Sequence, residues 1–152
     1  MTIETFNKAI LIVEDDPTYR HLWERLIQDL GIKKLWVMED PTKATKIIQE
    51  NQIDLMISDV VMPKMSGYEL AKTAKNKNPK TEVLLTTGYQ TDLSRFDLGT
   101  LRCHLLHKPY HNLNDVCTFL TRLLKGEDLF QGMDEQSFSE NLDCPEITEW
   151  TL

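Results

Sequence analysis

Short apolar runs alternate with segments of helical periodicity along the first 126 residues of this chain. Ala9–Val13 is a compact run of mostly branched apolar residues, which is typical of a strand buried on both faces. The segment that follows it places apolar residues at helical spacing, namely Leu22, Leu26, Ile27 and Leu30. This alternation restricts the chain to folds in which strands and helices take turns.

The pattern repeats and predicts five strands and five helices. The expected strands cover residues 9–13, 35–38, 54–58, 83–85 and 105–106. Four helix starts are marked by residues that accept hydrogen bonds from free backbone amides: Asp16 before Pro17, Asp40 before Pro41, Ser66 with Glu69, and Asn112. A further helix is predicted over Tyr89–Leu98. We expect an α/β domain, (βα)5, in which a doubly wound five-stranded parallel sheet carries helices on both faces.

Charge divides the chain into two parts. It carries 17 Lys and Arg against 24 Asp and Glu, a formal net charge of −7. Eight of the acids lie in residues 127–152, which contain no Lys or Arg, so residues 1–126 hold 16 acids and 17 bases. We therefore predict a domain over residues 1–126 and an acidic tail over residues 127–152. This balance argues against direct binding to nucleic acid or to an anionic membrane, because both require a basic surface.

Cysteine content and the length of the apolar runs favour a cytoplasmic protein. Cys103, Cys117 and Cys144 are odd in number and form no CxxC pair, so we expect neither a disulfide framework nor a zinc site. The N-terminus lacks the basic start and apolar run of a signal peptide. The longest apolar runs are about five residues, far short of the roughly 20 that cross a bilayer. No membrane insertion is expected.

Polar side chains gather where the predicted strands end. Glu14 and Asp15 follow the first strand, and Asp59 follows the third. Thr87 and Lys108 follow the fourth and fifth. Open parallel sheets bind ligands beyond these carboxyl ends, so the five side chains are expected in one region. Grouped carboxylates call for a cation, and their hard oxygen ligands suit Mg²⁺.

The same group of residues also suits a phosphoryl group. A carboxylate can act as a nucleophile toward phosphorus, and Asp59 stands alone at its strand end. Lys108 and the Thr87 hydroxyl could then hold the phosphoryl oxygens by charge and hydrogen bonding. Asp16, next to the acidic pair, is interpreted as a helix cap only.

Four motifs occur in a characteristic order: Ile10-Leu-Ile-Val-Glu-Asp-Asp-Pro, Leu55-Met-Ile-Ser-Asp-Val-Val-Met-Pro-Lys-Met-Ser-Gly, Leu85-Thr-Thr-Gly and His107-Lys-Pro-Tyr. In their order and spacing, residues 8–126 resemble a response-regulator receiver domain of the CheY-like kind. This is the aspartate-phosphorylated module of two-component signalling. The resemblance covers about four-fifths of the chain and implies a flavodoxin-like fold.

The resemblance also implies a set of metal ligands. By spacing, the family's acidic pair falls on Glu14 and Asp15. Asp15 is expected to bind Mg²⁺ directly and Glu14 mainly through water. Asp59 matches the phosphoacceptor and is a further ligand, and the backbone carbonyl of Val61 matches the remaining protein ligand.

Further roles follow from the same resemblance. Thr87 and Lys108 match the two phosphate-sensing side chains, and Pro109 matches a proline whose preceding peptide bond is often cis. The expected phosphoryl donor is a sensor histidine kinase or a histidine phosphotransfer protein. Such a domain is a stoichiometric phosphoacceptor that assists its own phosphorylation and dephosphorylation, not a turnover enzyme. It would signal by protein contact or by phosphorelay to a downstream protein that the sequence does not identify, with homodimerisation as an option.

One position departs from the family pattern. The family usually carries Tyr or Phe three residues before the lysine, and that ring moves on activation, whereas this chain has Leu105. The usual route from Thr87 to an aromatic switch is therefore not expected here. Tyr89 and Tyr110 are nearby rings to which the sequence alone assigns no role.

Three other functions fit the sequence less well than a phosphorylated receiver. A haloacid-dehalogenase-type hydrolase needs a second acid two residues after its nucleophile, where this chain has Val61. A nucleotide- or flavin-binding domain needs a glycine-rich loop after the first strand, where this chain has acids. A pseudo-receiver that is never phosphorylated remains an alternative, although the acids, Thr87 and Lys108 are all present.

The tail has two interpretations. Its acidic composition suits a solvated, disordered extension, whereas its apolar residues, which include Phe130, Phe138 and Trp150, suit a segment that docks on a partner or on its own domain. The tail is too short and too acidic for a DNA-binding output domain. We therefore expect a stand-alone receiver.

The residues around the phosphoacceptor predict slow loss of the phosphoryl group. In the family, the positions two residues after the phosphoacceptor and two after the threonine influence phosphate lifetime. Here they are Val61 and Tyr89, and neither side chain is an amide or acid that could orient an attacking water. Measuring autodephosphorylation tests this expectation, and a half-life of seconds would contradict it.

Overall fold

The computed structural model describes residues 7–88, 102–110, 112–127 and 147–151. Its elements in chain order are β1 (Ala9–Val13), α2 (Pro17–Asp29), β2 (Lys34–Met38), α3 (Pro41–Glu50), β3 (Leu55–Asp59), α4 (Gly67–Lys77), β4 (Glu82–Thr87), β5 (Arg102–His107), α5 (Leu113–Leu124) and β6 (Ile147–Thr151). The helix predicted over Tyr89–Leu98 lies outside the described residues.

The strands form one sheet in the order β2-β1-β3-β4-β5-β6. β1 to β5 are all parallel, and this confirms the predicted five-stranded parallel sheet of the flavodoxin-like α/β fold. β6 was not predicted as a strand. It pairs antiparallel with β5 along the edge of the sheet, with Leu106 opposite Ile147 and Arg102 opposite Thr151.

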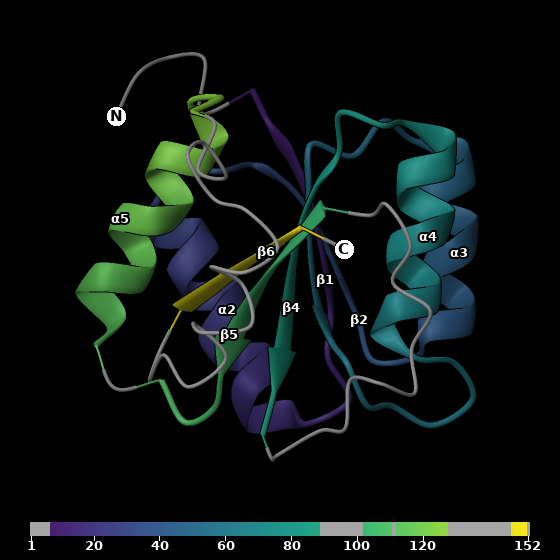
Figure 1. Cartoon of the computed structure of the whole chain (residues 1–152), viewed down its shortest axis with the longest axis horizontal. Helices are drawn as coiled ribbons and strands as arrows, with labels where there is room; N and C mark the ends of the chain where they lie inside the picture. The colour runs from purple at the N-terminus through teal and green to yellow at the C-terminus, as the bar shows by residue number, and fades with distance from the viewer. Residues whose placement is uncertain (1–6, 89–101, 111, 128–146, 152) are drawn as a thin grey trace.

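Two hydrophobic cores lie on opposite faces of the sheet. Successive side chains of a strand point to opposite faces, so on β1 Leu11 and Val13 enter one core while Ile10 and Ile12 enter the other. Helices α3 and α4 cover the first face, and α2 and α5 cover the second (Figure 1). Because both faces are covered, the central strands read as continuous apolar runs.

The predicted helix caps are confirmed. The Asp16 carboxylate accepts hydrogen bonds from the backbone amides of Thr18 (2.8 Å) and Tyr19 (3.4 Å) at the start of α2. Ser66 and Glu69 form the reciprocal capping box at the start of α4. The Asp16 cap starts α2 at Pro17, soon after β1 ends at Val13, so the loop that carries Glu14 and Asp15 is short, whereas residues 60–66 connect β3 to α4.

The fifth strand is longer than predicted. The apolar pair Leu105–Leu106 marked only its centre, whereas β5 runs from Arg102 to His107. His104 is buried despite its polarity, because its ring packs edge-on against Phe119 of α5 with 5.0 Å between ring centroids. A histidine therefore occupies an inward-facing position of β5, where an apolar residue is expected, and this is why the apolar pattern predicted too short a strand.

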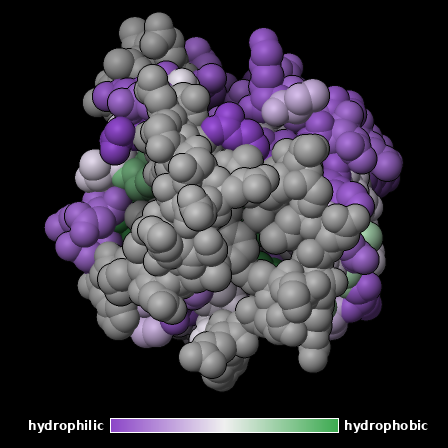
Figure 2. All heavy atoms as spheres, viewed as in Figure 1, coloured by the Kyte–Doolittle hydropathy of each residue, from purple (hydrophilic) through white to green (hydrophobic). Residues whose placement is uncertain are grey.

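The outer surface is mostly hydrophilic over α3 and α4, as Figure 2 shows at the right of the molecule. Among the residues that the structure describes, no helix is both long enough and apolar enough to span a membrane.

Candidate functional site

The carboxyl ends of four parallel strands bring the predicted site residues to one edge of the sheet. Glu14 and Asp15 follow β1, Asp59 is the last residue of β3, Thr87 is the last of β4, and Lys108 follows β5. β1 and β4 both flank β3, and β5 lies beside β4. Strand order therefore places Asp59 between the acidic pair and the residues of β4 and β5.

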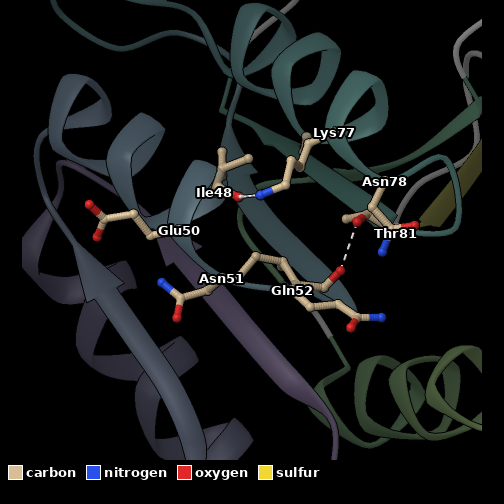
Figure 3. A pocket seen from close by; sticks show the side chains of 9 residues that line it. Ile48, Glu50, Asn51, Gln52, Lys77, Asn78 and Thr81 are labelled. Atoms are coloured by element: carbon tan, nitrogen blue, oxygen red, sulfur yellow. Dashed lines mark hydrogen bonds between the residues drawn. The ribbon is translucent and has the colours of Figure 1, made fainter.

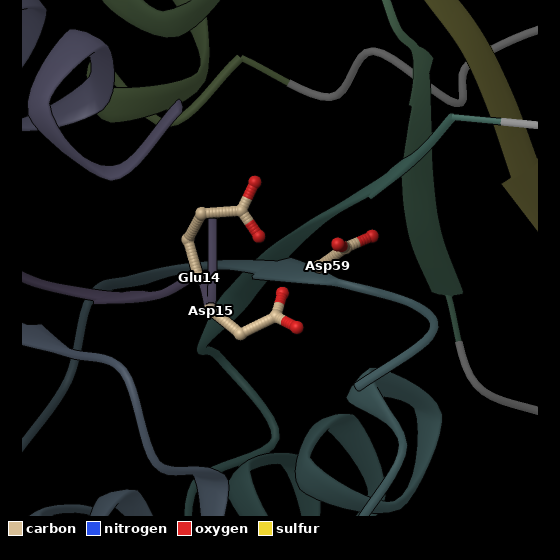
Figure 4. A group of neighbouring side chains, drawn as sticks. All are labelled: Glu14, Asp15 and Asp59. Carbon is tan, nitrogen blue, oxygen red and sulfur yellow. The ribbon is translucent and has the colours of Figure 1, made fainter. Parts of the chain in front are cut away.

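Three carboxylates form the centre of this site. One oxygen each of Glu14, Asp15 and Asp59 lies within 4.8 Å of the others. Figure 4 shows the three side chains directed toward a common space. Glu14 is only 2% exposed, Asp15 is exposed and Asp59 is half-buried, so the cluster is open to solvent on one side.

Lys108 joins two of these carboxylates. Its Nζ donates to Glu14 Oε1 at 2.5 Å and to Asp59 Oδ2 at 3.2 Å. The lysine side chain is 9% exposed, so both contacts are largely shielded from water. One ammonium thus partly neutralises two negative groups that would otherwise repel each other.

Burial raises the pKa of Glu14 to about 7, and the nearby negative charge of Asp59 acts in the same direction against the opposing hydrogen bond from Lys108. Burial by itself lowers the pKa of Lys108, but the hydrogen bond to Glu14 and the charges of Asp59 and Glu14 outweigh it, so that pKa is raised. Lys108 is therefore charged at neutral pH, whereas Glu14 is poised between its two forms.

The residues fit a divalent cation. Glu14 Oε2 is buried and has no hydrogen-bond partner among the described residues. An unpaired buried carboxylate oxygen is costly, and a cation shared with Asp15 and Asp59 would satisfy it. Three carboxylates that provide hard oxygen ligands are the donor set that Mg²⁺ prefers.

Thr87 and Val61 occupy different environments. Thr87 ends β4 and is buried, with an exposed fraction of 2%. Val61 lies two residues beyond Asp59, in the loop that leads to α4, and is 62% exposed. The peptide bond between Lys108 and Pro109 is cis, which confirms the expectation for Pro109.

Gly67 lets the start of α4 rest directly on the backbone of Asp59. A Cβ at position 67 would lie 2.1 Å from the Asp59 carbonyl oxygen, a distance that no side chain can adopt. The Gly67 amide donates to the Val60 carbonyl at 2.9 Å. The loop that carries Val61 is therefore held at both ends, by the strand and by the helix start.

Two residues at the site were missed by the sequence analysis. Arg20 Nη1 donates to the backbone carbonyls of Glu14 (3.1 Å) and Asp15 (3.4 Å), which ties the acidic loop to α2. The Tyr19 ring lies against Lys108, with 4.2 Å from Nζ to the ring centroid. Both residues lie in the first turn of α2, one turn after the Asp16 cap. That position was the available signal, but neither apolar spacing nor the Asp16–Pro17 cap singles out these two side chains.

A separate pocket lies at the opposite end of the sheet. It has a volume of about 320 Å³ and lies where α3 and α4 end, next to the starts of β3 and β4 (Figure 3). Lys77 donates to backbone carbonyls at the end of α3, and Thr81 Oγ1 donates to the Ile53 carbonyl at 2.7 Å. Lys77 thus satisfies carbonyls at the end of α3, and Thr81 satisfies a carbonyl of the connection between α3 and β3, so the polar groups of the pocket have a structural role.

Comparison with known proteins identifies the family. The family model of the response regulator receiver domain matches residues 10–112. The chain belongs to this family and is therefore a receiver domain of two-component signalling, as the sequence motifs implied. Every predicted site residue, from Glu14 to Lys108, falls within the matched span.

Individual relatives agree with this assignment. The response regulator receiver protein CpdR of Brucella abortus is 29% identical over 118 residues, which cover 77% of this chain and 97% of CpdR. The Regulator of RpoS of Escherichia coli is 32% identical over 147 residues, which cover 88% of this chain but 43% of that longer protein. The solved structure of response regulator TrrA from Thermotoga maritima, in complex with Mg²⁺ and BeF, matches with a TM-score of 0.62 and 28% identity, over 76% of this chain and 98% of TrrA.

The raised pKa of Glu14 predicts how stability depends on pH in the absence of divalent cations. Between pH 4.5, the usual pKa of a glutamate, and about pH 7, the folded protein keeps a proton on Glu14 that the unfolded chain has released. The free energy of unfolding should therefore fall as the pH rises through this window. Urea unfolding in EDTA at about pH 5 and about pH 8 measures the change.

The variant Glu14→Gln should lose this part of the pH dependence, because its amide does not titrate. Added Mg²⁺ should stabilise the wild-type protein more at the higher pH, where the Glu14 carboxylate is ionised. The same pH dependence in wild type and Glu14→Gln would contradict the assignment.

Proposed function

We propose that this receiver domain accepts a phosphoryl group on Asp59 from a histidine kinase or a histidine phosphotransfer protein. Mg²⁺ would be held by Glu14, Asp15, Asp59 and the backbone carbonyl of Val61. The observation that carries the proposal is the Lys108 ammonium, which bridges Glu14 and Asp59 inside a cluster of three carboxylates. This arrangement offers a nucleophile, a cation site and a fixed positive charge within a few ångströms.

The chemistry is a transfer between two nucleophiles. An Asp59 carboxylate oxygen attacks phosphorus, an O–P bond forms, and the N–P bond to the donor histidine breaks. Bound Mg²⁺ would neutralise charge on the transferred group. Lys108 Nζ, 3.2 Å from Asp59 Oδ2, is placed to pair with a phosphoryl oxygen, and the Thr87 hydroxyl is assigned to another.

The carboxylate of Asp59 is consumed in this step. Each domain takes up one phosphoryl group, so the protein is a stoichiometric phosphoacceptor that assists its own phosphorylation and dephosphorylation. A hydrolase of the haloacid-dehalogenase type is disfavoured because Val61, at the position where that mechanism needs an acid, is an exposed valine. An unphosphorylated pseudo-receiver would not need a buried lysine poised between two carboxylates.

Labelling with acetyl phosphate tests the proposal. The wild-type protein should take up one phosphoryl group in the presence of Mg²⁺ and none in EDTA. Asp59→Asn should take up none, because its amide is not a nucleophile. Intact-protein mass spectrometry and Phos-tag electrophoresis measure the uptake.

Asp16→Asn is the matched control for this experiment. It removes the same charge one residue beyond the acidic pair, and asparagine caps a helix as well as aspartate does. It should be labelled like wild type. Equal labelling of wild type and Asp59→Asn, or labelling that ignores Mg²⁺, would overturn the proposal.

We also propose that residues 1–126 form the receiver unit and that the acidic tail, residues 127–152, docks on this unit through β6. The support is the antiparallel pairing of Ile147–Thr151 with β5. Without β6, β5 would be an edge strand with unpaired backbone groups, and such edges are usually covered.

Removal of the tail should expose the backbone of β5. In a chain truncated after Gly126, amide hydrogen exchange should increase in β5, because donors that β6 satisfied now face water. Exchange in β1, which is paired on both sides by β2 and β3, should stay as in the full chain. Unchanged exchange in β5 would favour the solvated, undocked tail instead.

A further inference from the structure

The usual aromatic switch position holds a core aliphatic residue in this chain. Leu105 is 3% exposed and belongs to the core beneath α3 and α4, together with Leu85 and Cys103. It offers no ring that could change position near Thr87. Any response of the core to the state of the site must therefore use other residues.

A column of three aromatic rings begins at the site lysine. Lys108 Nζ lies 4.2 Å from the Tyr19 ring centroid. The Tyr19 ring meets Tyr110 edge-on, with 5.3 Å between centroids and 76° between planes. Tyr110 in turn meets Trp23 at 5.2 Å and 62°, and Trp23 Nε1 donates to the Tyr110 hydroxyl at 3.0 Å.

The column leads into the core on the other face of the sheet. Trp23 is 1% exposed and packs in the core beneath α2 and α5, with Leu106 and Leu120. Tyr110 packs against the same core and also hydrogen-bonds to Thr86 of β4, the neighbour of Thr87. The rings thus connect the site to α2, β4 and the core that α5 covers.

We propose that Tyr19 is a positioning residue for Lys108, and that Tyr110 and Trp23 transmit the position of this lysine to the core between α2 and α5. This inference rests on the proposed phosphorylation of Asp59. In the family, an aromatic ring at the position of Leu105 changes position on activation, on the face that α3 and α4 cover. We assign the corresponding role in this chain to rings on the face that α2 and α5 cover.

The physical basis is the limited set of partners around the ammonium. Lys108 Nζ has two carboxylate oxygens and one ring face, in a setting where the side chain is 9% exposed. A cation over a tyrosine face is attracted by the ring quadrupole, and the attraction grows when water is excluded. Tyr19 therefore restricts where the ammonium can lie and keeps it within reach of Asp59.

Phosphorylation would change this balance. A phosphoryl group on Asp59 presents more negative oxygens than the carboxylate it replaces, so the ammonium shifts toward it and is held there by the Tyr19 face, and the ring moves with the ammonium. Tyr110 lies two residues after Lys108 in the chain, and its ring contacts Tyr19. A displacement of Lys108 therefore acts on both the backbone and the ring of Tyr110. Because the Tyr110 hydroxyl accepts a hydrogen bond from Trp23 Nε1, a displacement of Tyr110 changes the environment of the indole.

A double-mutant cycle separates positioning from simple packing. The measured quantity is the affinity for Mg²⁺ with beryllofluoride, which mimics the phosphoryl group on an aspartate. Tyr19→Leu should weaken this affinity by about three- to thirtyfold, the range expected for loss of a shielded cation–π contact. Tyr19→Phe retains the ring face and should rescue the affinity. In a Lys108→Ala background, Tyr19→Leu should have no further effect.

His21→Ala, at an exposed position two residues further along α2, serves as the control and should bind like wild type. If Tyr19→Leu lowered the affinity for Mg²⁺ with beryllofluoride equally with and without Lys108, the ring would act through packing alone and the inference would be wrong. The inference would also be wrong if Tyr19→Leu bound beryllofluoride as tightly as wild type or more tightly.

Tryptophan fluorescence tests transmission along the column. The chain has three tryptophans, so Trp36→Phe and Trp150→Phe leave Trp23 as the sole emitter. Mg²⁺ with beryllofluoride should shift the Trp23 emission in this background. The shift should be much smaller with Tyr110→Phe, which removes the acceptor of the indole hydrogen bond, while beryllofluoride binding, measured by ¹⁹F NMR, persists. An unchanged shift in Tyr110→Phe would overturn the transmission step.

The two proposals fail in distinguishable ways. If the parent protein binds no beryllofluoride and takes no label on Asp59, the proposed function fails and the column is packing only. If the parent is labelled on Asp59 but Tyr19→Leu binds beryllofluoride like wild type, the function stands and the inference about Tyr19 is wrong.

Discussion

The rest of the site depends on the contact between the Lys108 ammonium and the buried Glu14 carboxylate. Three carboxylates within 4.8 Å of one another would repel strongly, and burial makes the charge on Glu14 costlier still. Lys108, directly after β5, offsets part of that charge, although β3 and β4 lie between β5 and β1 in the sheet. The other oxygen of Glu14 has no hydrogen-bond partner in the part of the chain that the structure describes, and a divalent cation shared with Asp15 and Asp59 would satisfy it.

The sheet positions these groups without long loops. Parallel strands end at the same edge, so residues far apart in sequence meet there whenever each one directly follows its strand. The helices that follow restrain the loops at their far ends. Asp16 caps α2, and Gly67 lets the start of α4 contact the Asp59 backbone. Arg20 adds a second restraint on the carbonyls of the acidic loop. These contacts restrain the loops that carry Glu14, Asp15 and Val61.

Much of this arrangement could be predicted from the sequence. The alternation of apolar runs and helical spacing predicts the parallel sheet, and the position of each polar residue just after a strand predicts that these residues gather at one edge of the sheet. Caps such as Asp16 and Ser66 are local interactions between residues two or three apart, so they too are visible in the sequence. The length of β5 could not be predicted from the sequence. It includes the buried His104, whose ring packs against Phe119, 15 residues further along the chain.

The sequence by itself determined the fold class, the order of the strands and the identity of the residues that follow them at the site, because periodicity and capping act between near neighbours in the chain. Only the tertiary structure decided which groups touch. Lys108 bridging Glu14 and Asp59, the Tyr19–Tyr110–Trp23 column and the pairing of β6 with β5 all join residues from different elements. Such contacts are set by how the elements pack and by which face of the sheet each side chain takes, and no local pattern in the chain encodes that choice.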